Sequence, residues 1–292
     1  MRQLIVAACG AALLALAACT TQTERVVPDN SIRPDTTISL LEREAYLNRL
    51  YISLLGRKPD AAESQAAFSS FEADGCGPQS RTQLVAGLMN RPEFYDNVYR
   101  SLRRDYLNDL DTATIRWQLE EWKRTIDQLE RDHPTWATVV RQYITRLERL
   151  QALPDDLAAG RIDLIEAHRR CVQNNFYDEI NMGTENFVVS CFSHFLSRYP
   201  TLIELEQGKR MVDAQPAELF GRYGRSQNDF LDAFFGHTGY FEGQVKLLYQ
   251  RYLYREPRPD EASALVRQYT STRDWKALWR HLLTSSDYVR SR

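Results

Sequence analysis

The residues in this sequence that are able to do chemistry do not form a recognisable catalytic or metal-binding pattern. The five histidines are scattered, and no HxxxH, HExxH or CxxC motif occurs. His194 directly follows Ser193, but adjacency in the sequence does not make a nucleophile–base pair, and the GxSxG turn that presents a nucleophilic serine is missing. The sequence therefore predicts no metal, no cofactor and no enzyme activity. The alternative is a glycan-cleaving enzyme, because 39 acidic residues offer many carboxylate pairs.

One group of residues, an arginine, a proline and a glutamate, occurs three times at the same spacing. The groups are Arg57, Pro59 and Glu63, then Arg198, Pro200 and Glu204, and finally Arg255, Pro257 and Glu261. Each follows an apolar segment that contains an aromatic residue. Proline ends one helix, and a glutamate in the first turn of the next helix is favoured by the helix dipole. We therefore expect three helix corners in which arginine pairs with glutamate, a structural role.

The segments around these corners have the pattern of helices. Apolar residues between Leu41 and Leu55 recur at spacings of three and four, Gly56 suits a helix end, and Asp60 with Glu63 predicts the cap of the next helix. Glycine (13) and proline (11) are scarce in the 292 residues. The sequence predicts an all-α fold with three related helical repeats, which cover residues 40–99, 184–243 and 244–292.

An insertion, residues 100–183, separates the first two repeats. Apolar residues alternate by four and three from Ile115 to Leu129 and again from Trp136 to Leu150, with a break at Pro134. Two such helices joined by a short turn predict an antiparallel helical hairpin. Its apolar seams either pack on each other and on the repeats, or the hairpin projects and binds a partner.

The first residues have the layout of an export signal. Arg2 precedes an apolar run, and Leu-Ala-Ala-Cys closes it at Cys19. This ending resembles the bacterial lipobox, which implies a signal peptide over residues 1–18, cleavage between Ala18 and Cys19, and acylation of Cys19. Residues 19–39 then form a tether. Thr20 implies the outer membrane rather than the inner one. The alternatives are an ordinary signal peptide with an incidental cysteine and a transmembrane anchor.

Export also changes what the other cysteines imply. Cys76, Cys171 and Cys191 remain in the mature chain, and an oxidising compartment permits two of them to pair. We favour a disulfide between Cys76, which lies in a loop, and Cys171, which lies near a helix end. The alternative is three free or buried thiols.

The corner sequences resemble those of a known type of domain. The first copy reads LYISLLGRKPDAAE from Leu50 to Glu63, and the third reads LYQRYLYREPRPDE from Leu248 to Glu261. They resemble a small helical domain of uncharacterised function that occurs, often in tandem, in bacterial envelope and secreted proteins, and they are similar to the phycobilisome linker fold. The second copy departs from this pattern, with serine at position 197 where the first copy has glycine. The resemblance implies a scaffold or adhesion module.

Together these features predict an outer-membrane lipoprotein with a structural function. Its partners are the lipid bilayer, through acylated Cys19, and another protein of the cell envelope, and the anchored chain is expected to face the periplasm or the cell surface. The net charge of −2 gives no footprint for nucleic acid. Two alternatives stay open: a periplasmic all-α enzyme that acts on cell-wall glycan, and a carrier whose 15 tyrosines and five tryptophans line a ligand groove.

Overall fold

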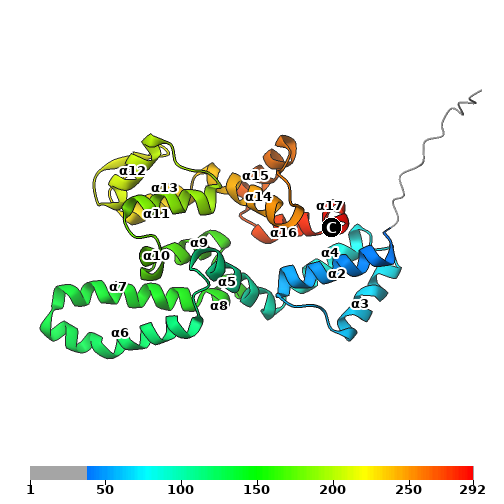
Figure 1. Ribbon diagram of the computed structural model, residues 1–292, viewed down its shortest axis with the longest axis horizontal. Helices are drawn as coiled ribbons and strands as arrows, with labels where there is room; N and C mark the ends of the chain where they lie inside the picture. The colour runs from blue at the N-terminus through cyan, green and yellow to red at the C-terminus, as the bar shows by residue number, and fades with distance from the viewer. Residues whose placement is uncertain (1–37, 292) are drawn as a thin grey trace, which may run out of the picture. The chain divides into compact units, whose positions relative to one another are not determined.

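The computed structural model describes residues 38–291, and within this range the chain is all-α apart from one short two-stranded sheet (Figure 1). This confirms the predicted fold class. The predicted cleavage site at Ala18 and Cys19 lies outside the described residues. The chain from Ile38 onward forms one compact unit. The helices of the first predicted repeat are α2 (Leu40–Leu55), α3 (Ala61–Glu72), α4 (Pro78–Met89) and α5 (Pro92–Tyr106).

The insertion contains the two long helices that the sequence predicts, followed by three short ones. They are α6 (Thr112–Asp132), α7 (Pro134–Gln151), α8 (Leu153–Ala158), α9 (Leu164–Val172) and α10 (Asn175–Ile180). Figure 1 shows α6 and α7 side by side as an antiparallel pair. Trp122 stacks on Tyr143 with ring centroids 5.2 Å apart. An ion pair between Lys123 and Glu148 (2.9 Å) also joins the two helices. The seams of the hairpin therefore pack on each other, and α7 joins the pair to α8 and α9.

The second and third predicted repeats share a helix. The remaining elements are α11 (Thr184–Cys191), the π-helix η1 (Phe192–Leu196), α12 (Leu202–Val212), β1 (Ala217–Leu219), β2 (Arg222–Gly224), α13 (Gln227–Phe235), α14 (Thr238–Leu253), α15 (Pro259–Thr272), α16 (Trp275–Leu283) and α17 (Ser286–Arg290). Helix α14 follows α13 as α5 follows α4, and it precedes the third corner as α2 precedes the first. The predicted boundary at residue 243 therefore falls inside one continuous helix.

The two strands are an element that the sequence did not predict. Strands β1 and β2 pair antiparallel, with Leu219 opposite Arg222, so Phe220 and Gly221 form a two-residue turn. Both have positive φ, 53° and 75°, as a type I′ turn requires. The hairpin fills the connection between α12 and α13, and it packs on both helices.

A glycine in α14 allows that helix to lie directly against η1. A Cβ atom at Gly243 would lie 2.1 Å from the backbone oxygen of Phe195 and 2.6 Å from the Cα of Leu196. The next residue, Gln244, donates a hydrogen bond (3.2 Å) to the same Phe195 oxygen. A wide π-turn disturbs the regular helical hydrogen bonds, and here a side chain from the neighbouring helix satisfies the carbonyl.

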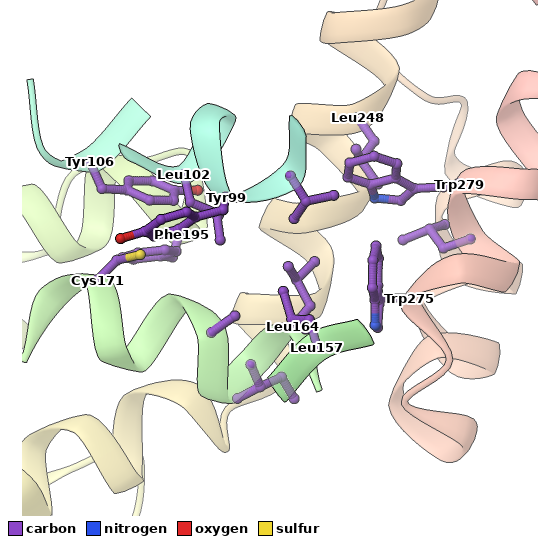
Figure 2. Close-up of a cluster of buried hydrophobic side chains, with 14 of the residues drawn as sticks. Tyr99, Leu102, Tyr106, Leu157, Leu164, Cys171, Phe195, Leu248, Trp275 and Trp279 are labelled. Carbon is purple, nitrogen blue, oxygen red and sulfur yellow. The ribbon is translucent and has the colours of Figure 1, made fainter. Parts of the chain in front are cut away.

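The first and third predicted repeats pack against each other. Arg49 of α2 donates hydrogen bonds (2.9 Å each) to the backbone oxygens of Tyr288 and Val289 at the end of α17. The ring of Phe94 in α5 stacks on Trp275 in α16 at 5.7 Å. These contacts join residues that are far apart in the sequence into one core; Arg49 and Val289 are 240 positions apart. Figure 2 shows a part of that core where buried side chains from α5, α9, α14 and α16 meet.

The cysteines contradict the predicted disulfide. Cys76, Cys171 and Cys191 are all buried and unpaired. Cys76 lies near Tyr46 and Arg81 in the first repeat, whereas Cys171 is on α9, in the cluster with Tyr99 and Tyr106 that Figure 2 shows. The prediction of a Cys76–Cys171 bond is therefore wrong. Each thiol occupies a small apolar position in its own part of the core, as free cysteines often do.

Candidate functional site

The first predicted corner is built around Arg57, which makes three kinds of contact at once. Its guanidinium donates two hydrogen bonds to the carboxylate of Glu63, at 2.8 and 2.9 Å. It lies over the ring of Tyr51 at 5.8 Å, and it also reaches Glu93 in the first turn of α5 (3.1 Å). Glu63 in turn accepts a hydrogen bond from the backbone N–H of Asp60, which closes the predicted cap of α3.

The second and third corners repeat this geometry, so the predicted arginine–glutamate pair is present at all three. Arg198 donates to Glu204 at 2.8 and 2.6 Å, and Arg255 donates to Glu261 at 2.8 and 2.9 Å. Each arginine also lies over the ring of an aromatic residue in the helix that precedes it, Phe192 or Tyr249, at 5.0 Å. A proline lies between the arginine and the glutamate of each pair, at positions 59, 200 and 257. Because proline cannot continue a helix, it separates the helix before the corner from the helix after it.

These contacts explain why the corner residues are not a chemical site. The hydrogen bonds from arginine lower the pKa values of the glutamates, to about 2 for Glu204 and Glu261. A carboxylate that already accepts a bidentate arginine and a backbone N–H has few lone pairs left for a substrate. The corner residues therefore join helices.

The three corners differ strongly in what they expose to solvent. At the second corner Tyr199, Leu202 and Ile203 are 76, 87 and 75% exposed. We call these three side chains the corner-two patch. The equivalent residues are Lys58, Ala61 and Ala62 at the first corner and Glu256, Pro259 and Asp260 at the third, and none of them is a large apolar side chain. The apolar character of the patch is thus not required to form a corner.

A second candidate site is a cavity that no sequence pattern predicted. It has a volume of about 470 Å³, within the range of small-molecule sites, and it lies between α5, α9, η1, α14 and α16. Its walls are mainly apolar and include Leu102, Leu164, Leu247, Leu248 and Trp279. Figure 2 shows Leu102, Leu164, Leu248 and Trp279 converging from four separate helices.

The polar groups of this cavity do not form a catalytic arrangement. His194 shares a hydrogen bond with the hydroxyl of Tyr177 (3.1 Å), and His168 shares one with that of Tyr240 (2.8 Å). Burial lowers the pKa of His194 and lowers that of His168 to about 3, so both imidazoles are neutral near pH 7. In the described part of the chain, neither hydrogen-bonds to Ser193.

The charged residues at the cavity are a pair from distant parts of the sequence. Arg251 of α14 is hydrogen-bonded to Asp105 of α5, and Arg104 also contacts Asp105 (3.1 Å). The acid whose burial raises its pKa to about 6, Asp178, accepts a hydrogen bond from Gln227 and does not line this cavity. Asp178 therefore has the raised pKa that a glycan-cleaving acid needs, but it has no place in the cavity.

The comparisons with known proteins do not place this chain. Neither a protein-family model, nor a curated protein, nor a solved structure matches it. The resemblance to the tandem envelope repeat and to the phycobilisome linker fold therefore stays a prediction. No helix between residues 38 and 291 is both long and apolar enough to cross a membrane. In the same range no cluster of His, Cys, Asp and Glu is placed to hold a metal ion.

Proposed function

We propose that this chain is a membrane-anchored lipoprotein that docks to another protein of the cell envelope through the corner-two patch. The observation that carries the proposal is the exposure of Tyr199, Leu202 and Ile203 at a corner whose two copies have no large apolar side chain at the equivalent positions. Because the same backbone corner forms without them, these side chains serve something other than the fold.

The size and chemistry of the patch suit a protein partner. Burying a large apolar side chain contributes about 1.5–3 kcal/mol, so three of them supply a substantial part of the binding energy of an ordinary interface. Tyrosine is also enriched among the residues that dominate such interfaces. The patch covers the end of the η1–α12 connection and the first turn of α12, where the bidentate pair of Arg198 and Glu204 fixes the backbone. A partner therefore meets a preorganised surface.

The anchor is the second part of the proposal. Acylation of Cys19 attaches the chain to the outer membrane, facing the periplasm or the cell surface. Residues 20–39 then form the tether between the lipid and α2, which begins at Leu40. Several acyl chains on one residue give stable anchoring, because each buried CH₂ adds about 0.8 kcal/mol.

Site-specific photo-crosslinking in living cells tests the docking surface. A photoreactive amino acid replaces Leu202, and the matched control carries it at Ala61, the same position of the first corner. We expect a discrete crosslinked protein from position 202 and none from position 61. Exchanging the patch for the residues of the first corner, by Tyr199→Lys, Leu202→Ala and Ile203→Ala, should then abolish co-isolation of that protein. Equal products from both positions, or none from either, contradict the docking surface.

The anchor has an independent test. A Cys19→Ala variant should leave the membrane fraction, whereas the unaltered chain should carry a mass increase from acyl groups. Retention of the exported variant in the membrane rejects the lipid anchor and leaves the docking surface unaffected.

A further inference from the structure

The apolar cavity continues into a second one of different character. The second cavity, about 390 Å³, shares four lining residues with the first, so the two are adjoining parts of one depression; the shared residues are Val98, Ser101, Arg251 and Trp279. Its other walls include Arg100 and Arg104 of α5. The depression therefore has an apolar end and an arginine-lined end.

The arginine-lined end carries an excess of positive charge. Arg104 and Arg251 both contact Asp105, so one carboxylate is shared between two guanidinium groups. Arg100 has no ion pair or hydrogen bond within the described part of the chain. Since each guanidinium has five N–H donors, most of the donors at this end are free to bind a ligand. A planar fork of donors is suited to carboxylate and phosphate groups.

One aromatic side chain joins the two cavities. Trp279 is 7% exposed, and it lines both the apolar cavity and the arginine-lined one. The apolar wall therefore continues from one cavity into the other without a break at the junction.

We propose that the depression binds an anionic amphiphile with a single aliphatic chain. The carboxylate or phosphate head lies among Arg100, Arg104 and Arg251, and the chain enters the cavity walled by Leu102, Leu248 and Trp279. A wholly apolar ligand leaves the arginines unused, and a small free anion leaves the apolar end empty, so an amphiphile is the class that fits both ends. The site involves other residues than the corner-two patch, and it does not depend on the docking function.

Photoaffinity labelling of the full chain in its own membranes tests this site. The first probe is a fatty acid that carries a diazirine on its chain, and the matched control is the fatty alcohol of the same chain. A lysophospholipid with that chain is the third probe, and its labelling relative to the acid distinguishes a phosphate headgroup from a free carboxylate. We expect peptides from α5, α14 and α16 to be labelled at least about fivefold more by an anionic probe than by the alcohol.

Two variants and one control make the test specific. Arg100→Gln, at an exposed and unpaired residue, should reduce labelling by the anionic probes about fivefold and leave labelling by the alcohol unchanged. Ser101→Trp fills the junction of the cavities and should suppress labelling by every probe. Arg116→Gln, an exposed residue on α6, should change nothing. The proposal is overturned by the absence of labelling in these helices, by equal labelling with acid and alcohol, or by labelling that neither Arg100→Gln nor Ser101→Trp alters.

Discussion

One residue ends the helix before each corner, and exchanging it should change the stability of the fold. The change is expected to be stabilising at two of the corners and destabilising at the other. Gly56, Ser197 and Tyr254 all adopt the left-handed conformation, with φ of 72°, 53° and 54°. A residue with a side chain costs about 1–2 kcal/mol there, whereas glycine costs about 0.5–1 kcal/mol more entropy on folding. Ser197→Gly and Tyr254→Gly should therefore each stabilise the protein by about 0.5–1 kcal/mol. The ring of Tyr254 is 75% exposed, so little packing is lost with it.

The reverse change at the first corner should be destabilising by a larger amount. A Cβ atom at position 56 would lie 2.6 Å from Oδ1 of Asn97, whose amide donates a hydrogen bond (3.1 Å) to the backbone oxygen of Ser53. Gly56→Ala therefore adds a steric clash and a disturbed hydrogen bond to the conformational cost. We expect a loss of about 2–3 kcal/mol.

Urea denaturation followed by circular dichroism measures all three changes. The transition midpoint should rise for Ser197→Gly and Tyr254→Gly and fall for Gly56→Ala, with an unchanged dependence on urea concentration. The reasoning fails if Gly56→Ala leaves the midpoint where it is, or if both glycine variants lower it.

Three further predictions concern the corners, the η1–α14 contact and the thiols. Since the bond from Arg198 lowers the folded pKa of Glu204 from 4.5 to about 2, its contribution to stability is present above about pH 5 and is lost as the pH falls toward 2; a pH series of urea midpoints should show a shallower acid dependence for Glu204→Gln. Gly243→Ala should lower the free energy of unfolding by about 3 kcal/mol or prevent folding, because the added Cβ atom would collide with backbone atoms. Gly87 lies within α4, and a Cβ atom there would meet open space, so Gly87→Ala should raise the free energy of unfolding by about 0.5–1 kcal/mol in the same assay. Burial raises the pKa values of the three described thiols, so we expect a thiol-alkylating reagent to modify them only in the presence of denaturant. Mass spectrometry should also show no change in mass on adding reductant. Alkylation of the native protein would contradict this. The thiols are Cys76, Cys171 and Cys191.

The parts of the fold that the sequence predicted are those determined by neighbouring residues. Gly56 ends α2, and Asp60 and Glu63 cap α3, because each acts on backbone groups within four residues of itself. The hairpin of α6 and α7 likewise follows from a local alternation of apolar residues and a break at Pro134. Repetition at three places strengthened these local signals.

The candidate cavity and the cysteine environments depend on contacts over long separations. Asp105 and Arg251 are 146 positions apart, and no pattern in a single sequence relates them. Cys76 and Cys171 looked able to pair because one lies in a loop and the other near a helix end, but tertiary packing places them among different neighbours. The sequence also did not show that α14 belongs to both the second and the third predicted repeat. A match between copies shows that a segment is repeated, but it does not show that the last helix of one copy is the first helix of the next.

The contact between α17 and α2 bears on the order in which the chain acquires its structure. Arg49 and Tyr46 of α2 receive their partners from Tyr288 and Val289, and Arg49 and Val289 are 240 positions apart. A polypeptide made from its N-terminus therefore keeps this face of α2 uncovered until α17 has been synthesised. Such late closure slows folding, because contacts between distant residues require a long loop to close first. Loss of α17 alone would leave this face of α2 without its cover.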